Sequence, residues 1–169
     1  QETSQTTTSL GWFLLSREET DSLLKEVHGV YRTEINDVLL AALSMALREV
    51  TRDSVHYITL EGHGREDIDS SIDITRTMGW FSTFYPVRLE SADDLGTTLK
   101  ATKERLRSIP HKGLGYGALF GYKDLPKILF NYLGQFEGSE SGFWHLSHEE
   151  SGLSVSPGNK DAYVMSINS

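Results

Sequence analysis

A chain of 169 residues is long enough to form one domain with a hydrophobic core, or a large part of a longer one. Its 24 acidic and 16 basic residues give a net charge of −8, which argues against a nucleic-acid partner, because phosphate binding needs clustered Lys and Arg. The sequence contains no cysteine, which excludes disulfides and thiolate metal ligands within it, and no apolar run is long enough to cross a membrane.

The first stretch of the chain contains a linker and a capped helix. Residues 1–9 are polar and rich in Thr and Ser, and we interpret them as a linker. The apolar run 10–15 predicts a short strand. Ser16 and Glu19 have the spacing of a capping box, which predicts a helix start, and Gly29 is expected to end that helix with a left-handed cap.

A long helix and two strands are predicted next. Apolar residues recur at helical spacing over 35–50, which indicates an amphipathic helix. Apolar and β-branched residues over 55–60 and 81–89 predict strands, and the polar stretch 67–77 between them predicts a loop. Pro86 indicates that the second strand lies at a sheet edge or contains a bulge.

The second half of the chain continues the alternation of helices and strands. We expect a helix between 91 and 110, a glycine-rich turn at 113–117, strands over 128–133 and 163–167, and a polar loop over 135–151. This order predicts an α/β or α+β fold in two layers, with helices covering a sheet.

The hexapeptide Glu-Gly-His-Gly-Arg-Glu at 61–66 follows the predicted strand 55–60 directly. Its two glycines allow positive φ and close backbone approach, so the loop can direct side chains into a cleft. A carboxylate at a strand end, such as Glu61, is a candidate general base. The alternative is that Glu61 forms an ion pair with Arg65 or Arg76 and only fixes the loop.

Three further features have both a functional and a structural interpretation. The six histidines are scattered without metal-ligand spacing, so His63 is expected to be a hydrogen-bonding strut and no metal site is predicted. Asn131 and Tyr132, at the end of an apolar strand, either orient a bound carbonyl or amine or satisfy their own hydrogen bonds. The turn 113–117 lacks the Gly-Lys-Ser/Thr ending of a phosphate-binding loop.

Five stretches, in order along the chain, resemble the epimerization domains of nonribosomal peptide synthetases. They are residues 36–42, 61–66, 76–86, 110–117 and 130–134. The resemblance implies a chloramphenicol acetyltransferase-like fold, in which two subdomains form a V around the active site. It identifies residues 10–169 as the C-terminal subdomain, without the N-terminal subdomain and the final C-terminal portion.

The resemblance implies an isomerase domain within a multifunctional ligase of peptide antibiotic biosynthesis. Its reaction inverts, from L to D, the α-carbon of an aminoacyl or peptidyl thioester carried on the 4′-phosphopantetheine arm of a peptidyl carrier protein. No metal or directly bound cofactor is expected. The implied partners are the upstream carrier protein, the N-terminal subdomain and a downstream condensation domain, in the cytoplasm, without nucleic acid or membrane.

The same resemblance assigns roles to individual residues. Glu61 is one acid/base group, and Asn131 and Tyr132 orient the substrate or face the enolate. The residues expected to bind substrate and shape the site are His63, Arg65, Trp80 and Tyr85. The other acid/base is the second His of a His-His-x-x-x-Asp-Gly motif in the N-terminal subdomain. This sequence has no adjacent histidines, so the chain alone is predicted to be inactive.

Two other functions would fit the same fold. A condensation domain would transfer the acyl group to an amine and form a peptide bond. A non-catalytic subdomain would only dock a carrier protein, and its binding would not depend on Glu61.

Overall fold

The computed structural model describes residues 9–134, 149, 152, 156, 159 and 162–169. The chain forms two units by its internal contacts, Gln1–Ile35 and Asn36–Ser169. In the first unit, helix α1 (Arg17–Lys25) is followed by the short helix α2 (Val27–Tyr31). The predicted capping box is confirmed, because the Glu19 backbone N–H donates to the Ser16 hydroxyl over 3.2 Å and the Ser16 N–H donates to the Glu19 carboxylate over 2.7 Å.

Two predictions for the first unit are wrong. Residues 10–15 form no strand, and the side chains of Leu10 and Phe13 are 90% and 85% exposed. An extended segment becomes a strand only when a neighbouring strand pairs with its backbone, and none of the described strands does so. Gly29 does not end the first helical region either, because α2 runs through it and the left-handed cap falls on Arg32, with φ 50°.

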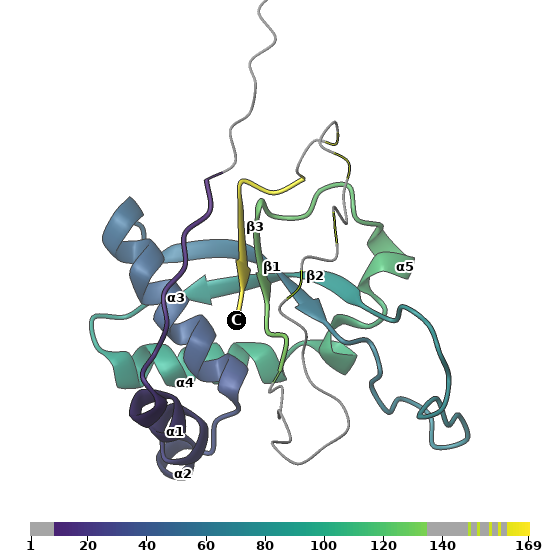
Figure 1. Cartoon of the computed structure of the whole chain (residues 1–169), viewed down its shortest axis with the longest axis horizontal. Helices are drawn as coiled ribbons and strands as arrows, with labels where there is room; N and C mark the ends of the chain where they lie inside the picture. The colour runs from purple at the N-terminus through teal and green to yellow at the C-terminus, as the bar shows by residue number, and fades with distance from the viewer. Residues whose placement is uncertain (1–8, 135–148, 150–151, 153–155, 157–158, 160–161) are drawn as a thin grey trace, which may run out of the picture. The chain divides into compact units, whose positions relative to one another are not determined.

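The second unit contains a four-stranded sheet (Figure 1). Its elements are α3 (Ile35–Thr51), β1 (Val55–Gly62), β2 (Thr83–Glu90), α4 (Leu95–Arg107), the 3₁₀ turn η1 (Pro110–Gly113), α5 (Tyr116–Phe120), β3 (Ile128–Asn131) and β4 (Met165–Asn168). The strand order is β2-β1-β3-β4. Strand β1 is antiparallel to β2 and parallel to β3, and β3 is parallel to β4.

Most of the predicted elements of this unit are confirmed. The long helix and the strand before the hexapeptide form as expected, and β2 is an edge strand, as Pro86 indicated. The predicted turn 113–117 also contains the start of the short helix α5. The sequence did not predict this helix because glycine has a low helix propensity. The predicted loop 135–151 lies outside the described residues except for Glu149.

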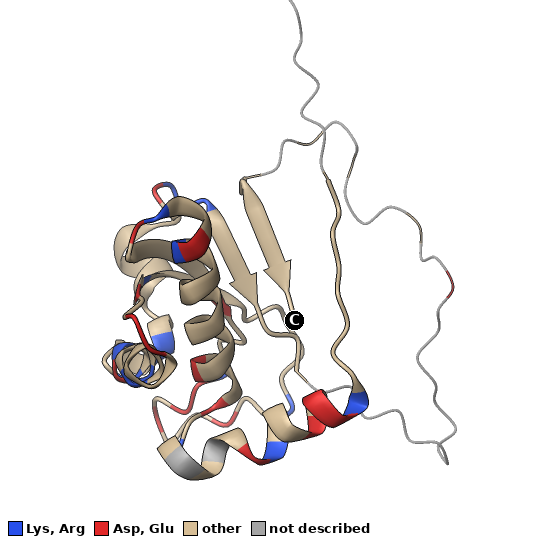
Figure 2. Cartoon of the chain, turned by 90° about the vertical axis from the view of Figure 1, so that its left-hand side faces the viewer, with Lys and Arg blue, Asp and Glu red and all other residues tan. Residues whose placement is uncertain are grey.

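The hydrophobic core lies between the helices and one face of the sheet, which we call the core face. Figures 1 and 2 show α3 and α4 on this side of the strands. The buried members of the core cluster are Leu40, Leu47, Ile58, Leu60, Tyr85, Val87, Leu89 and Phe130, with Leu106 of α4 packed against them. Burial of each large side chain stabilises the fold by about 1.5–3 kcal/mol relative to its exposure, before entropy is subtracted.

The opposite side of the sheet, which we call the outer face, carries the alternate residues of each strand. On β1, Ile58 and Leu60 belong to the core, so the period of two places Thr59 and Glu61 on the outer face. Thr59 is nevertheless fully buried, and its hydroxyl donates to the Pro126 carbonyl over 2.8 Å. The segment that precedes β3 therefore covers part of the outer face. Among the described residues, no helix is long and apolar enough to span a bilayer.

Candidate active site

Polar side chains follow the last core residues of neighbouring parallel strands. Leu60 of β1 pairs with Phe130 of β3, and both belong to the hydrophobic core. The next residues, Glu61 and Asn131, lie level with one another by the same register, and both are on the outer face. Paired strands are about 4.8 Å apart, so a carboxylate and an amide are neighbours at the carboxyl edge of the sheet. Ligand sites typically lie at this edge of parallel strands.

The Glu61 side chain is half-buried and is not engaged by the arginines considered as its partners. Within the described part of the chain, neither Arg65 nor Arg76 forms an ion pair with Glu61. The structure therefore does not support the interpretation that Glu61 merely fixes the loop through an ion pair. An unpaired carboxylate beside an amide can accept a proton from a bound group, while the amide N–H donates to an adjacent oxygen.

The connection between β1 and β2 is held in place by Arg65. Its guanidinium donates to the carbonyls of Ile74 and Thr77 over 3.0 Å and to that of Gly79 over 3.4 Å. It also lies 4.3 Å from the centroid of the Phe81 ring, in a cation–π contact. In the structure Arg65 therefore fixes the loop through backbone carbonyls. Its predicted role in substrate binding stays a prediction.

The second glycine of the hexapeptide allows this loop to pack closely. Gly64 has φ +66°, and a Cβ atom at this position would lie 1.6 Å from the Phe81 carbonyl oxygen. No side chain fits such a gap, so glycine is required for the approach of the loop to Phe81.

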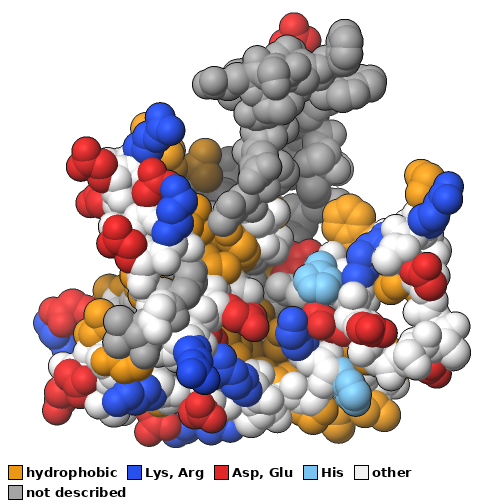
Figure 3. All heavy atoms as spheres, turned by 90° about the horizontal axis from the view of Figure 1, so that it is seen from below, with side chains coloured by type: hydrophobic (Ala, Val, Ile, Leu, Met, Phe, Trp, Pro, Cys, Tyr) orange, Lys and Arg blue, Asp and Glu red, His pale blue; other side chains and the backbone are white. Residues whose placement is uncertain are grey.

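His63 is a strut within the same loop. Its Nδ1 accepts a hydrogen bond from the Arg65 backbone N–H over 3.0 Å, so the ring proton is on Nε2, which lies 3.0 Å from a Glu66 carboxylate oxygen. The other Glu66 oxygen is 3.4 Å from the Lys112 ammonium, which ties the loop to η1. Because His63 is 64% exposed, this network contributes little stability. Acidic and basic side chains are interspersed on the face seen in Figure 3.

Tyr85 lies on the core face, away from Glu61. Its side chain is 6% exposed and packs so closely on Gly113 that an added Cβ there would be 2.2 Å from the ring. Burial, and to a smaller extent the nearby charge of Glu66, raises the pKa of Tyr85 to about 12. Its predicted part in substrate binding therefore stays a prediction, and the observed contacts are those of a core residue.

The other two aromatic residues predicted for the site, Tyr132 and Trp80, do not lie beside Glu61 on the sheet. Tyr132 directly follows β3, is half-buried and packs against the core cluster, whereas Asn131 lies on the outer face. Trp80 lies in the β1–β2 connection and is 89% exposed. The structure thus brings Glu61 and Asn131 together on one face of the sheet, and it does not place Tyr132 with them.

Two residues that the sequence patterns did not single out belong to this part of the outer face. Asn168 of β4 pairs with Asn131, which extends the polar row across a third parallel strand. On the other side, Phe84 of β2 is the register partner of Glu61. The similar strand ends Ile-Leu-Phe-Asn at 128–131 and Met-Ser-Ile-Asn at 165–168 were the available signal for Asn168.

Comparison with known families identifies the chain. The condensation domain family matches residues 1–168. The chain belongs to the condensation domain family. Surfactin synthase subunit 1 of Bacillus subtilis (strain 168) is 44% identical over 159 residues, which cover 86% of this chain and 4% of that protein. Tyrocidine synthase 2 of Brevibacillus parabrevis is 41% identical over 169 residues, which cover 92% of this chain and 5% of that protein. The chain therefore spans a small part of the length of these relatives.

Among solved structures, this chain is similar to an epimerization domain and to a condensation domain. The epimerization domain from the third module of tyrocidine synthetase B superimposes with a TM-score of 0.82 at 42% identity, covering 92% of this chain and 38% of that one. The first condensation domain of the CDA synthetase gives a TM-score of 0.56 at 15% identity, over 74% of this chain and 29% of that one, and so shows the fold alone. The predicted chloramphenicol acetyltransferase-like α/β fold is confirmed, in a nonribosomal peptide synthetase domain of the condensation and epimerization type.

Proposed function

We propose that the complete domain epimerizes the α-carbon of an aminoacyl or peptidyl thioester, with Glu61 as one of its two acid/base groups. The observation that carries the proposal is the half-buried Glu61 carboxylate, unpaired within the described residues, beside Asn131 at the carboxyl edge of the sheet. The likeness to a solved epimerization domain at 42% identity supports epimerization.

The chemistry that this edge supports is a proton transfer at carbon. The Glu61 carboxylate accepts the α-proton, and the electron pair of the broken C–H bond moves into the thioester to form an enolate. The Asn131 amide N–H donates to the enolate oxygen and stabilises the charge that develops there. Reprotonation on the opposite face completes the inversion. Its donor, on the resemblance described above, is a histidine of the N-terminal subdomain.

The remaining assignments concern the substrate and its carrier. Of the residues that the resemblance assigns to the site, His63, Arg65 and Trp80 shape the path to the thioester from the β1–β2 connection. Tyr85 and Tyr132 face the core and act indirectly, by supporting the strands that carry Phe84 and Asn131. The substrate arrives on the 4′-phosphopantetheine arm of an upstream peptidyl carrier protein and leaves toward a downstream condensation domain. The domain works in the cytoplasm as the isomerase part of a multifunctional synthetase, and no metal takes part.

The test uses the complete parent domain with its loaded carrier protein in heavy water. Deuterium entry at the α-carbon and the ratio of D to L product after thioester release are followed for wild type and for Glu61→Gln. The amide cannot accept the α-proton, and general acid–base groups contribute about 100- to 10,000-fold, so a loss of this size is expected. Glu90→Gln, an exposed carboxylate at the far end of the same hairpin, is the matched control and should keep its activity.

Two results would replace the proposal. Absence of exchange in the wild type, together with peptide formation when an amine acceptor is supplied, would establish a condensation domain. Tight carrier binding without either reaction, unaffected by Glu61→Gln, would establish a docking subdomain.

A further inference from the structure

We propose that Phe84 determines substrate specificity, by forming the wall against which the side chain of the carried amino acid packs during epimerization. The inference rests on the proposed function, because it takes Glu61 as the group that removes the α-proton. It assigns the complete domain a preference for substrates with bulky apolar side chains.

The position of Phe84 follows from the pairing of β1 with β2. Phe84 is the antiparallel partner of Glu61, and such partners have Cα atoms about 4.5–5.5 Å apart with both side chains on one face. Thr83 and Tyr85, its neighbours in sequence, are buried on the core face, whereas Phe84 is half-buried on the outer face. A substrate whose α-carbon reaches the Glu61 carboxylate therefore brings its side chain within reach of the Phe84 ring.

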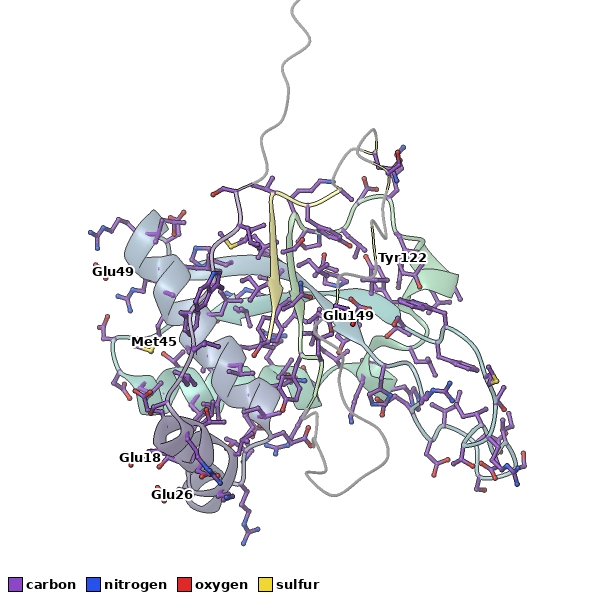
Figure 4. All side chains as sticks on the ribbon, viewed as in Figure 1. Glu18, Glu26, Met45, Glu49, Tyr122 and Glu149 are labelled. Carbon is purple, nitrogen blue, oxygen red and sulfur yellow. The ribbon has the colours of Figure 1, made fainter. Side chains whose placement is uncertain are left out.

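The Phe84 ring is held by a second aromatic residue. Tyr122, labelled in Figure 4, meets Phe84 edge to face, with ring centroids 6.0 Å apart and planes at 85°. Gly117 makes room for Tyr122, since an added Cβ at Gly117 would lie 2.1 Å from the Tyr122 hydroxyl oxygen. The last glycine of the glycine-rich turn therefore has a packing role that supports the wall beside Glu61.

The order of side chains across the sheet orients the substrate. From β2 to β4 the outer face at this level carries Phe84, Glu61, Asn131 and Asn168. An α-carbon above the carboxylate then has an apolar surface on one side and two amides on the other. The amide N–H groups can donate hydrogen bonds to the thioester oxygen. The Phe84 ring offers apolar surface, and a polar substrate side chain would lose hydrogen bonds to water by packing there.

The experiment compares two substrates in the complete parent domain. Carrier proteins loaded with L-phenylalanine and with L-alanine are tested for α-deuterium entry in heavy water, and kcat/KM is measured for each. Phe84→Ala should lower the phenylalanyl-to-alanyl ratio by about 2- to 12-fold, the range given by the loss of one aromatic contact. Phe84→Leu should lower it less, and it keeps the test available if the alanine variant does not fold.

Matched variants separate the wall from its surroundings. Tyr57→Ala removes an exposed aromatic residue from the same face of β1, four positions before Glu61, and should leave the ratio unchanged. Gly117→Ala displaces Tyr122 and should lower the ratio in the same direction as Phe84→Ala.

Three outcomes would overturn the inference. The first is an equal fall for both substrates in Phe84→Ala, which would make Phe84 a structural residue. The second is an unchanged ratio in Phe84→Ala and Phe84→Leu, with the wild-type exchange still dependent on Glu61, which would refute the wall and leave the proposed function intact. The third is absence of exchange in the wild type, which would refute the proposed function and this inference with it.

Discussion

Replacing Gly113 by alanine is expected to destabilise the domain strongly, because Gly113 is where the η1 turn crosses the buried Tyr85 ring. Gly113 has φ +77°, and an added Cβ would lie 2.2 Å from two atoms of that ring. An L-residue in the left-handed region costs about 1–2 kcal/mol, and extra volume in a packed core costs about 1–3 kcal/mol. The sum predicts a loss of about 2–5 kcal/mol in the free energy of unfolding.

The measurement is thermal or urea unfolding of the complete parent domain, in which both the melting temperature and the urea midpoint are expected to fall. Gly115→Ala is the matched control, because its φ is −83° and the nearest atom to an added Cβ is 4.0 Å away, on Leu119. This control should change the free energy of unfolding by less than about 0.5 kcal/mol. Tyr85→Ala removes the ring that the added Cβ would strike. The double variant should therefore lose less unfolding free energy than the two single variants lose together.

An unchanged melting temperature in Gly113→Ala would refute the packing argument. It would mean that the glycine is not needed for the approach of the turn to Tyr85. A fully additive double variant would show that the cost comes from backbone strain alone and not from contact with the ring.

The other predictions concern stability against pH and the order of the β1–β2 connection. In the folded domain the pKa of Tyr85 is raised from 10.0 to about 12. Between these values the unfolded chain releases the Tyr85 proton before the folded domain does, so the free energy of unfolding is unaffected below pH 10 and falls by roughly 3 kcal/mol as pH rises toward 12. Urea midpoints measured from pH 9 to 11.5 should show this loss, and Tyr85→Phe should remove that part of the slope; equal slopes in both proteins would contradict it. Arg65→Lys should speed amide hydrogen exchange over residues 67–79, because one ammonium cannot replace a planar fork that reaches three carbonyls. Arg76→Lys is the control. Equal protection of the loop amides from exchange in the two variants would show that Arg65 does not hold the loop.

Local sequence patterns predicted the elements whose causes are local. The capping box of Ser16 and Glu19, the apolar stripe of α3 and the edge position of Pro86 each follow from a few neighbouring residues, and all three are confirmed. Residues 10–15 show the limit of the same reasoning. Their apolar pattern suits a strand, but strand formation needs a partner elsewhere in the chain.

The candidate site shows a similar division. The sequence singled out Glu61 and Asn131 because polar groups at the ends of apolar strands are unusual. The pairing of Leu60 with Phe130 places these next two residues level with one another, and their roles stay a prediction. The sequence did not distinguish Phe84 from Tyr85, because adjacent strand residues face opposite sides of a sheet and only the pairing decides which side belongs to the site. Register is set by contacts between distant segments, so only the tertiary structure assigned Tyr85 to the core, Phe84 to the carboxylate and Asn168 to the end of the polar row.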